Sequence, residues 1–195
     1  MKIGRTLRNI FTVGGFTAFS RVLGLVREML QSRLIGAGVE QSAFTLAFAI
    51  PNMARKLFGE GALTAAFVPV FKDEVERESI EKAAKLARAV LTMVMLMLGA
   101  LVALGFVAIL LAGCVSVHPA NAYRYKTTLN LIAILLPYML AICGAAFGMG
   151  VLNALGKFKA SSFMPALLNF VWIAALVTLL FFPNLSVAAR VYWVA

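Results

Sequence analysis

Six ionisable side chains lie inside the first two apolar stretches of the chain, where a membrane-buried helix rarely carries any. They are Arg21, Arg27 and Glu28 in the first stretch and Arg55, Lys56 and Glu60 in the second. One charged side chain near the centre of a bilayer costs about 2.5 to 3.5 kcal/mol, so we expect all six to face protein or water. Four bases oppose two acids, which leaves a surplus of positive charge. Arginine suits phosphate because its planar fork donates two hydrogen bonds to adjacent oxygens. The cluster therefore predicts a membrane cavity for an anionic, phosphate-bearing ligand.

An alternative is that these charges form buried ion pairs with one another that only stabilise the fold. Lys56 and Glu60 are four residues apart, and Arg21 or Arg27 with Glu28 or Glu60 are the other candidate pairs. Such pairs neutralise the two acids but leave the surplus positive charge.

A helical projection at 100° per residue tests whether the polar residues of the second stretch share a face. An arc of about 140° holds seven residues, six of them polar: Ser42, Thr45, Asn52, Arg55, Lys56, Gly59 and Glu60. The rest of the circle is apolar and holds Leu46, Ala47, Ile50, Met53, Ala54, Leu57 and Phe58. One wall of this helix is therefore predicted to be polar and the other apolar.

The first stretch has a different pattern, because Arg21, Arg27 and Arg33 are spaced by six and point roughly 120° apart. Arg33 lies near the end of the stretch and is expected to reach the membrane interface. Ser20 falls on the side of Arg27, and Glu28 projects close to Arg21. Arg21 and Arg27 are deep enough to need an aqueous cavity.

The elements that carry these residues follow from composition. Hydrophobic residues make up 62% of the 195 residues and charged residues 13%, whereas soluble domains are nearer half apolar and a quarter charged. Apolar runs of membrane-spanning length lie near 9–36, 42–71, 86–113, 127–155 and 161–182, and a sixth begins near 186. The predicted fold is all-α, a polytopic transmembrane helical bundle with five to six spans.

Lysines and arginines gather in the N-terminal segment, in residues 72–88 and in residues 156–159. Because cytoplasmic loops are enriched in these residues, we expect the N-terminus to lie in the cytoplasm, with Arg124 and Lys126 as exceptions on the outer side. The net charge of +10 is assigned to these loops and to anionic lipid headgroups. No nucleic acid is expected as a partner.

Little in the sequence could support enzymatic chemistry. His118 is the single histidine, and Cys114 and Cys143 lack the spacing of metal ligands. The acidic residues between 73 and 81 mingle with bases and are interpreted as a solvated interfacial segment. We therefore expect no catalytic residue, no metal and no cofactor, and the chain is not expected to be an enzyme.

Several motifs resemble the opening of a known family. They are the run Phe19–Glu28, Gly36–Gly38, Ala43-Phe44, Pro51-Asn52, Arg55, Phe58–Gly61 and Ala66–Pro69. In this order they closely resemble the MurJ/MviN family of lipid II flippases, part of the multidrug, oligosaccharidyl-lipid and polysaccharide exporter superfamily. The resemblance is dense over residues 15–71 and mostly hydropathic beyond.

The resemblance implies a function for the charged cluster. Members of this family move the undecaprenyl-pyrophosphate-linked peptidoglycan precursor from the cytoplasmic to the periplasmic leaflet of the bacterial inner membrane, for cell-wall synthesis and cell shape. The cavity bases that bind pyrophosphate correspond to Arg21, Arg27, Arg55 and Lys56. Supporting polar residues of the cavity are Ser20, Glu28, Ser42, Asn52 and Glu60. One departure is Ser42, since the family usually has an acid there.

The resemblance also sets expectations about organisation and partners. Residues 1–195 are predicted to form part of the N-lobe of a two-lobed flippase. The expected partners are lipid II, or a similar lipid-pyrophosphate-linked precursor, and membrane lipids. Two alternatives stay open: an exporter of another lipid-linked oligosaccharide or a drug, and a truncated, non-transporting membrane scaffold that acts with cell-wall synthesis proteins.

Overall fold

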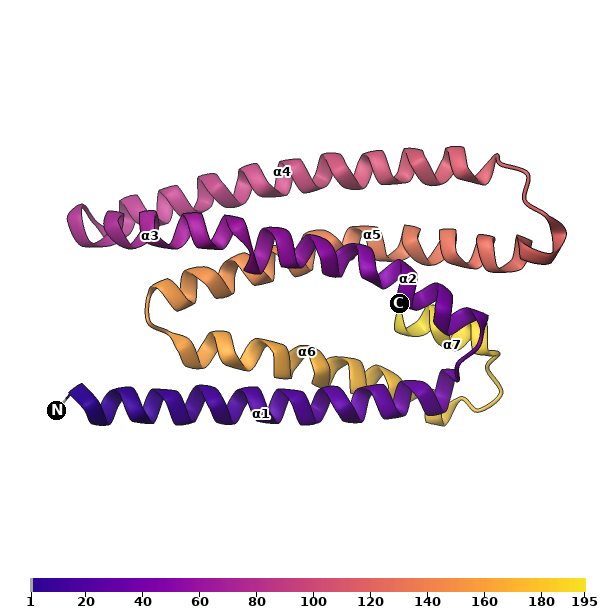
Figure 1. Cartoon of the computed structure of the whole chain (residues 1–195), viewed down its shortest axis with the longest axis horizontal. Helices are drawn as coiled ribbons and strands as arrows, with labels where there is room; N and C mark the ends of the chain where they lie inside the picture. The colour runs from indigo at the N-terminus through magenta and orange to yellow at the C-terminus, as the bar shows by residue number, and fades with distance from the viewer. Residues whose placement is uncertain (1) are drawn as a thin grey trace. The chain divides into compact units, whose positions relative to one another are not determined.

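A computed structural model describes the backbone of residues 2–195 and the side chains of residues 14–58, 61 and 64–195. Every regular element in this range is a helix (Figure 1). The elements are α1 (Lys2–Ile35), α2 (Val39–Ala54), the π-helical turn η1 (Arg55–Glu60), α3 (Ala62–Arg77), α4 (Ile80–Gly113), α5 (Pro119–Ala154), α6 (Phe158–Thr178), the 3-10 turn η2 (Leu179–Phe181) and α7 (Val187–Val194). They form two compact units: Met1–Gln41 with Gly156–Val194, and Ser42–Leu155.

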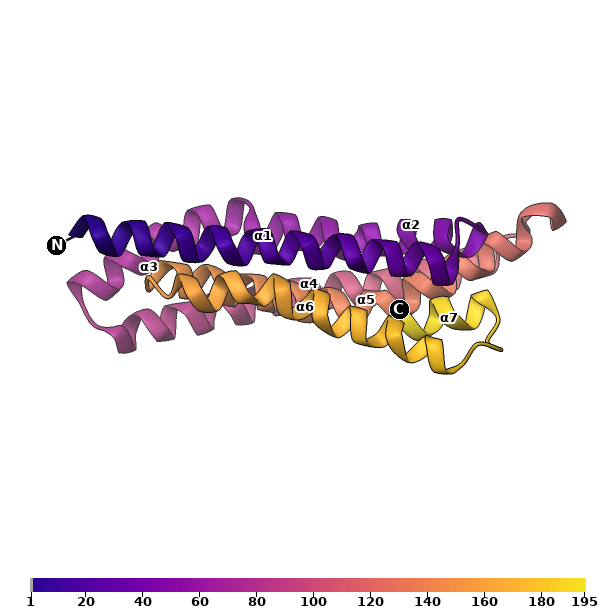
Figure 2. The same cartoon turned by 90° about the horizontal axis from the view of Figure 1, so that it is seen from below.

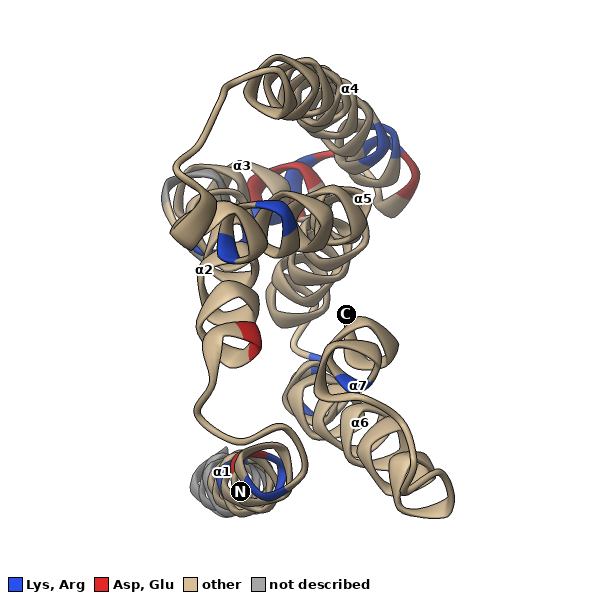
Figure 3. Cartoon of the chain, turned by 90° about the vertical axis from the view of Figure 1, so that its right-hand side faces the viewer, with Lys and Arg blue, Asp and Glu red and all other residues tan. Residues whose placement is uncertain are grey.

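Three helical segments within the described residues are long and apolar enough to cross a membrane. They are Ile80–Gly113, Pro119–Ala154 and Phe158–Phe181. Figure 3 shows that most of α4 is uncharged and that its charged residues lie at its start. The chain is therefore a helical membrane protein, and the larger number of spans expected from the sequence stays a prediction.

Several helices begin before the apolar runs that predicted them, because polar residues cap their first turns. The Ser79 hydroxyl accepts a hydrogen bond from the backbone N–H of Lys82 at 3.2 Å and begins α4. His118 Nδ1 accepts from the N–H of Ala120 at 3.4 Å, and Pro119 occupies the first turn of α5. These turns are too polar to register in a search for apolar runs.

The second predicted helix, residues 42–71, is interrupted. Pro51 lacks an N–H donor inside α2, and four residues later the chain changes to the π-helical turn η1. Gly61 then separates η1 from α3. A Cβ atom on Gly61 would lie 2.5 Å from the carbonyl oxygen of Lys56 and 3.0 Å from that of Leu57. Glycine at this position therefore permits the junction.

In the first unit, α1 and α6 run side by side in the same direction (Figures 1 and 2). Phe16 and Phe163 form an edge-to-face aromatic pair near the start of α6, with ring centroids 6.1 Å apart. At the other end, the Arg190 side chain of α7 donates hydrogen bonds to the carbonyls of Leu34 at 3.0 Å, Leu185 at 3.0 Å and Pro183 at 2.7 Å. Arg190 thus joins the end of α1 to the α6–α7 connection.

The second unit is built on the antiparallel pair α4 and α5, with α3 packed against both. Its main core lies between α4 and α5 and includes Leu98, Val102, Met139 and Cys143. A smaller core joins α3 to α5 through Phe67, whose ring centroid lies 4.9 Å from that of Phe147. These two cores hold α4 and α5, which position the α2–η1 segment.

Candidate functional site

Arg27 is the most enclosed of the predicted cavity arginines in the first unit. Its side chain is 21% exposed, and its Nη1 donates a hydrogen bond to Oδ1 of Asn169 on α6 at 3.1 Å. The guanidinium carbon lies 4.8 Å from the ring centroid of Trp172, within the range of a cation–π interaction. The helix α6 thus holds Arg27 from one side with two uncharged side chains.

The same asparagine contacts a second predicted residue of α1. Its Nδ2 donates to the backbone carbonyl of Ser20 at 3.0 Å and lies 3.4 Å from the Ser20 hydroxyl. Asn169 therefore bridges Ser20 and Arg27, which confirms that these two residues lie on the same side of α1.

Glu28 and Arg21 are placed differently from the projection. Glu28 was expected close to Arg21, but its carboxylate pairs with Arg27, with Nη2 and Oε1 3.4 Å apart. This is one of the structural ion pairs considered above, although the Glu28 side chain is 70% exposed. Arg21 is exposed and makes no hydrogen bond or ion pair with the described side chains. The contact with Glu28 leaves Arg27 only partly neutralised, since an exposed ion pair contributes at most about 1 kcal/mol.

Arg55 and Asn52 lie together in the second unit. The Nε of Arg55 donates to Oδ1 of Asn52 at 3.4 Å, and both residues are half-buried. Lys56 and Ser42 are exposed. The side chain of Glu60 lies outside the described residues, so its predicted pairing with Lys56 stays a prediction.

The π-helical turn changes the geometry on which the projection was based. From Arg55 onward the hydrogen bonds run from i to i+5, so each residue rotates the chain by less than the 100° of an α-helix. The predicted directions of Ser42, Asn52 and Arg55 relate to α2 and are little affected. The direction predicted for Glu60, five residues beyond Arg55, no longer follows from an α-helical projection.

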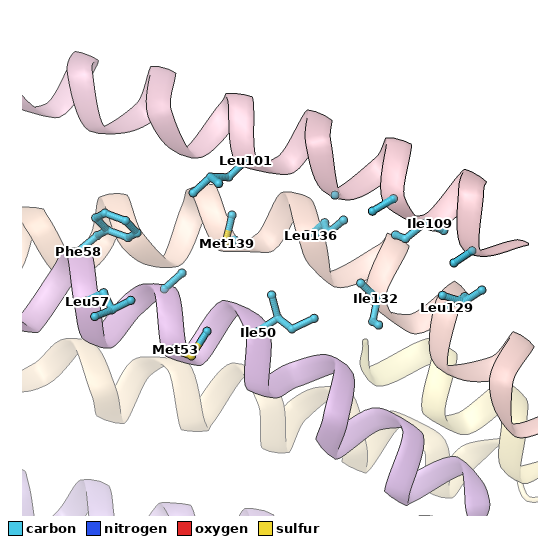
Figure 4. Close-up of a pocket in the computed structure, with 14 residues that line it drawn as sticks. Ile50, Met53, Leu57, Phe58, Leu101, Ile109, Leu129, Ile132, Leu136 and Met139 are labelled. Atoms are coloured by element: carbon cyan, nitrogen blue, oxygen red, sulfur yellow. The ribbon is translucent and has the colours of Figure 1, made fainter.

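The apolar side of the α2–η1 segment faces a cavity of about 550 Å³ within the second unit (Figure 4). Five residues of the predicted apolar face line it: Ile50, Met53, Ala54, Leu57 and Phe58. Its other lining residues come from α4 and α5 and are also apolar. The lining of this cavity offers no partner for an anion, and the hydrogen-bonded polar pair of the α2–η1 segment is Asn52 of α2 with Arg55 of η1.

Asn169 and Trp172 are the site residues that the sequence reasoning missed. They lie three residues apart on α6 and therefore share a helical face. Each carries a polar hydrogen-bonding group inside a predicted span, and this was the available signal. The bond from Arg27 to Asn169 joins residues 142 positions apart, so no local pattern identifies the pair.

The arrangement around Arg27 can bind an anion without covalent chemistry. Two uncharged groups orient the guanidinium, and Nη2 has only the long contact to Glu28 among the described residues. The Nε of Arg27 is buried and has no acceptor there, which costs roughly 1 to 3 kcal/mol for a buried donor. An anionic oxygen at this edge of the guanidinium would receive a charge-assisted hydrogen bond.

Comparison with known proteins agrees with this chemistry. The family model "Lipid II flippase MurJ" matches residues 31–195. A probable lipid II flippase MurJ from Rhizobium tropici is 34% identical over 179 residues, which cover 90% of this chain and 34% of that protein. A lipid II flippase MurJ from Burkholderia cenocepacia is 34% identical over 173 residues, covering 87% and 33%. A probable MurJ from Vibrio cholerae is 37% identical over 179 residues, covering 87% and 34%.

The chain spans about a third of the length of these relatives. The family match confirms the resemblance for the motifs from residue 31 onward and extends beyond residue 71, whereas the run Phe19–Glu28 precedes the matched range. A flippase moves a lipid and forms no covalent bond, which agrees with the prediction that the chain is not an enzyme. The family model matches most of the chain, and relatives more than 30% identical to it carry the same name. The chain therefore belongs to the MurJ family of lipid II flippases.

Proposed function

We propose that this chain is part of a flippase that moves lipid II, or a closely similar lipid-pyrophosphate-linked precursor, across the bacterial inner membrane. The cargo passes from the cytoplasmic to the periplasmic leaflet and supplies cell-wall synthesis. The chain forms part of the N-lobe, with its N-terminus in the cytoplasm. Family membership supports this proposal, as do the basic connections of the sequence.

The observation that carries the proposal is the environment of Arg27. Arg27 is held by an amide and an indole, neither of which is ionised, and its ionic contact among the described residues is the 3.4 Å pair with the exposed Glu28 carboxylate, so its positive charge is only partly neutralised. Deep in a membrane protein such a charge is costly, and its retention favours a role in binding an anion. Pyrophosphate is the anionic group of the cargo that the relatives' names indicate.

In the proposed mechanism the basic side chains bind the pyrophosphate, and no covalent bond is made or broken. Arg21 and Arg27 of α1, and Arg55 and Lys56 of η1, each donate hydrogen bonds to phosphate oxygens during the crossing. The lipid tail stays in the bilayer while the polar headgroup crosses. Ser20, Glu28, Ser42, Asn52 and Glu60 are the supporting polar residues of the path.

The test is a flippase assay on the complete product of the gene with Arg27→Ala and Arg55→Ala. Loss of charge-assisted hydrogen bonds worth about 1.5 to 3 kcal/mol predicts transport at least tenfold slower in each variant. Arg33→Ala is the matched control, because Arg33 is exposed near the end of the same helix as Arg27. Full activity of both variants, with membrane levels equal to those of the parent protein, would refute the proposed role.

A further inference from the structure

The side-chain amide of Asn169 is held at both ends, although it lies inside the helix α6. Oδ1 accepts from Arg27 Nη1 at 3.1 Å, and Nδ2 donates to the Ser20 carbonyl at 3.0 Å. Only 8% of the residue is exposed. Rotating the amide by 180° would set its NH₂ group against the donors of Arg27 and its oxygen against a carbonyl. One orientation of Asn169 is therefore fixed by its partners.

The helix α1 is shaped to receive this amide. Ser20, Gly24 and Arg27 are spaced by four and three residues, so they lie on one face. A Cβ atom on Gly24 would lie 3.7 Å from Asn169 Nδ2, in ordinary contact. A longer side chain at this position would take the place of the amide. A small residue at position 24 therefore lets Asn169 reach from α6 to the backbone of α1.

The chemical nature of the partner matters as much as its position. A carboxylate in place of the Asn169 amide would form an ion pair with Arg27 and cancel its charge. An amide accepts the same hydrogen bond and leaves the guanidinium positive. Trp172 adds a second neutral contact, at 4.8 Å from its ring centroid, which holds the guanidinium over the indole.

These contacts use Nη1 and leave the donors of the Nε–Nη2 edge without a close acceptor among the described residues. Nη1 is bonded to Asn169, whereas Nη2 has a 3.4 Å contact with the exposed Glu28 carboxylate. The buried Nε adjoins Nη2 on this second edge and has no acceptor among the described residues. The edge formed by Nε and Nη2 presents two donors in parallel, the geometry that fits two oxygens of one phosphate.

We propose that Asn169 is a positioning residue, which fixes Arg27 through Nη1 so that the Nε–Nη2 edge receives the phosphate oxygens of the lipid cargo. The Glu28 carboxylate exchanges with the phosphate at Nη2. Asn169 has no contact with the cargo in this arrangement and acts through Arg27 alone. The inference rests on the proposed function, in which Arg27 binds pyrophosphate.

A double-mutant cycle tests the inference on the complete protein in lipid nanodiscs, with undecaprenyl pyrophosphate as the probe. Asn169→Leu, which removes both hydrogen bonds at similar volume, is expected to weaken binding of the probe about tenfold. In an Arg27→Ala background the same substitution is expected to change the affinity by less than about twofold, because the residue through which it acts is gone. Asn130→Leu, an exposed asparagine of α5, is the matched control.

Transport in proteoliposomes gives a second measurement, the split between apparent affinity and maximal rate, which a purely structural role of Asn169 would not change in the same way. Asn169→Leu is expected to raise the cargo concentration for half-maximal transport about tenfold and to leave the maximal rate within about twofold. A lower maximal rate at unchanged half-maximal concentration would overturn the inference. Should Asn169→Leu fail to fold, Asn169→Ala enters the same cycle, since it removes both bonds without adding bulk.

The outcomes separate this inference from the proposed function. Unchanged binding by Arg27→Ala would refute the role of Arg27 itself. Weakened binding by Arg27→Ala together with unchanged binding by Asn169→Leu would refute only the positioning role. Additive losses in the double variant would also refute it, because Asn169 would then act independently of Arg27.

Discussion

Replacing Gly61 with alanine tests the junction between η1 and α3. The new Cβ would lie 2.5 Å from the Lys56 carbonyl oxygen and 3.0 Å from the Leu57 carbonyl oxygen. Both are backbone atoms of the π-helical turn, so neither can move away without opening the turn. Overpacking of this kind costs about 1 to 3 kcal/mol. With about 2 to 4 °C per kcal/mol for a chain of this size, Gly61→Ala is expected to lower the melting temperature by about 2 to 12 °C.

Gly99→Ala on α4 is the matched control, because a Cβ at Gly99 would meet no other atom within 4 Å. Alanine in an open helical position stabilises by about 0.5 to 1 kcal/mol relative to glycine, so this variant is expected to melt slightly higher than the parent. Both variants would be heated in detergent, and the folded fraction measured by size-exclusion chromatography. Equal melting temperatures for the two would show that the reasoning about the junction is incorrect.

Three further outcomes are expected. In spheroplasts a membrane-impermeant maleimide should label Cys114, which is exposed just after α4, and should not label the buried Cys143. Labelling of Cys114 only after permeabilisation would contradict the proposed cytoplasmic N-terminus. Arg190→Ala removes hydrogen bonds to three backbone carbonyls and should destabilise the protein by about 1.5 to 3 kcal/mol in the same heating assay. Arg190→Lys, which keeps the charge but not the planar fork, should recover less than half of that loss; full recovery would mean that charge alone matters. Phe67→Ala should cost about 3 kcal/mol, since Phe67 is 6% exposed, whereas Phe181→Ala, at 77% exposed, should change stability by less than about 0.5 kcal/mol. Similar losses from the two phenylalanine variants would contradict the assigned core.

The helices were largely predictable from the sequence, because apolar runs of sufficient length have few alternatives in a membrane. The run 86–113 lies within α4, and the run 127–155 overlaps all but the first turns of α5. The missing turns are polar and are specified by Ser79 and by His118 with Pro119. Hydropathy indicates which residues favour lipid, whereas N-capping residues indicate where a helix begins, so the two signals give different boundaries.

The helical projection could not predict the π-helical turn. A projection assumes one rotation per residue, and Pro51 indicates a distortion without giving its form. The sequence did contain the glycine that the junction needs, at Gly61, but glycine occurs at many positions where nothing approaches closely. Gly99 and Gly148 are two such positions. Only the three-dimensional structure distinguishes a glycine that a close contact requires from a glycine that could be replaced.

The comparison of two arginines shows how the structure separates a binding group from a structural one. Arg27 and Arg190 lie in the same unit, and each lies within an apolar stretch of the sequence. Arg190 directs Nε, Nη1 and Nη2 at three backbone carbonyls, at 2.7 to 3.0 Å, and so has a donor on each nitrogen committed to the fold. Arg27 commits Nη1 to a neutral amide, keeps a long contact at Nη2, and buries Nε without an acceptor among the described residues. Donors that the fold leaves unsatisfied beside a retained charge favour a ligand, and on this criterion Arg27 is suited to bind phosphate and Arg190 is not.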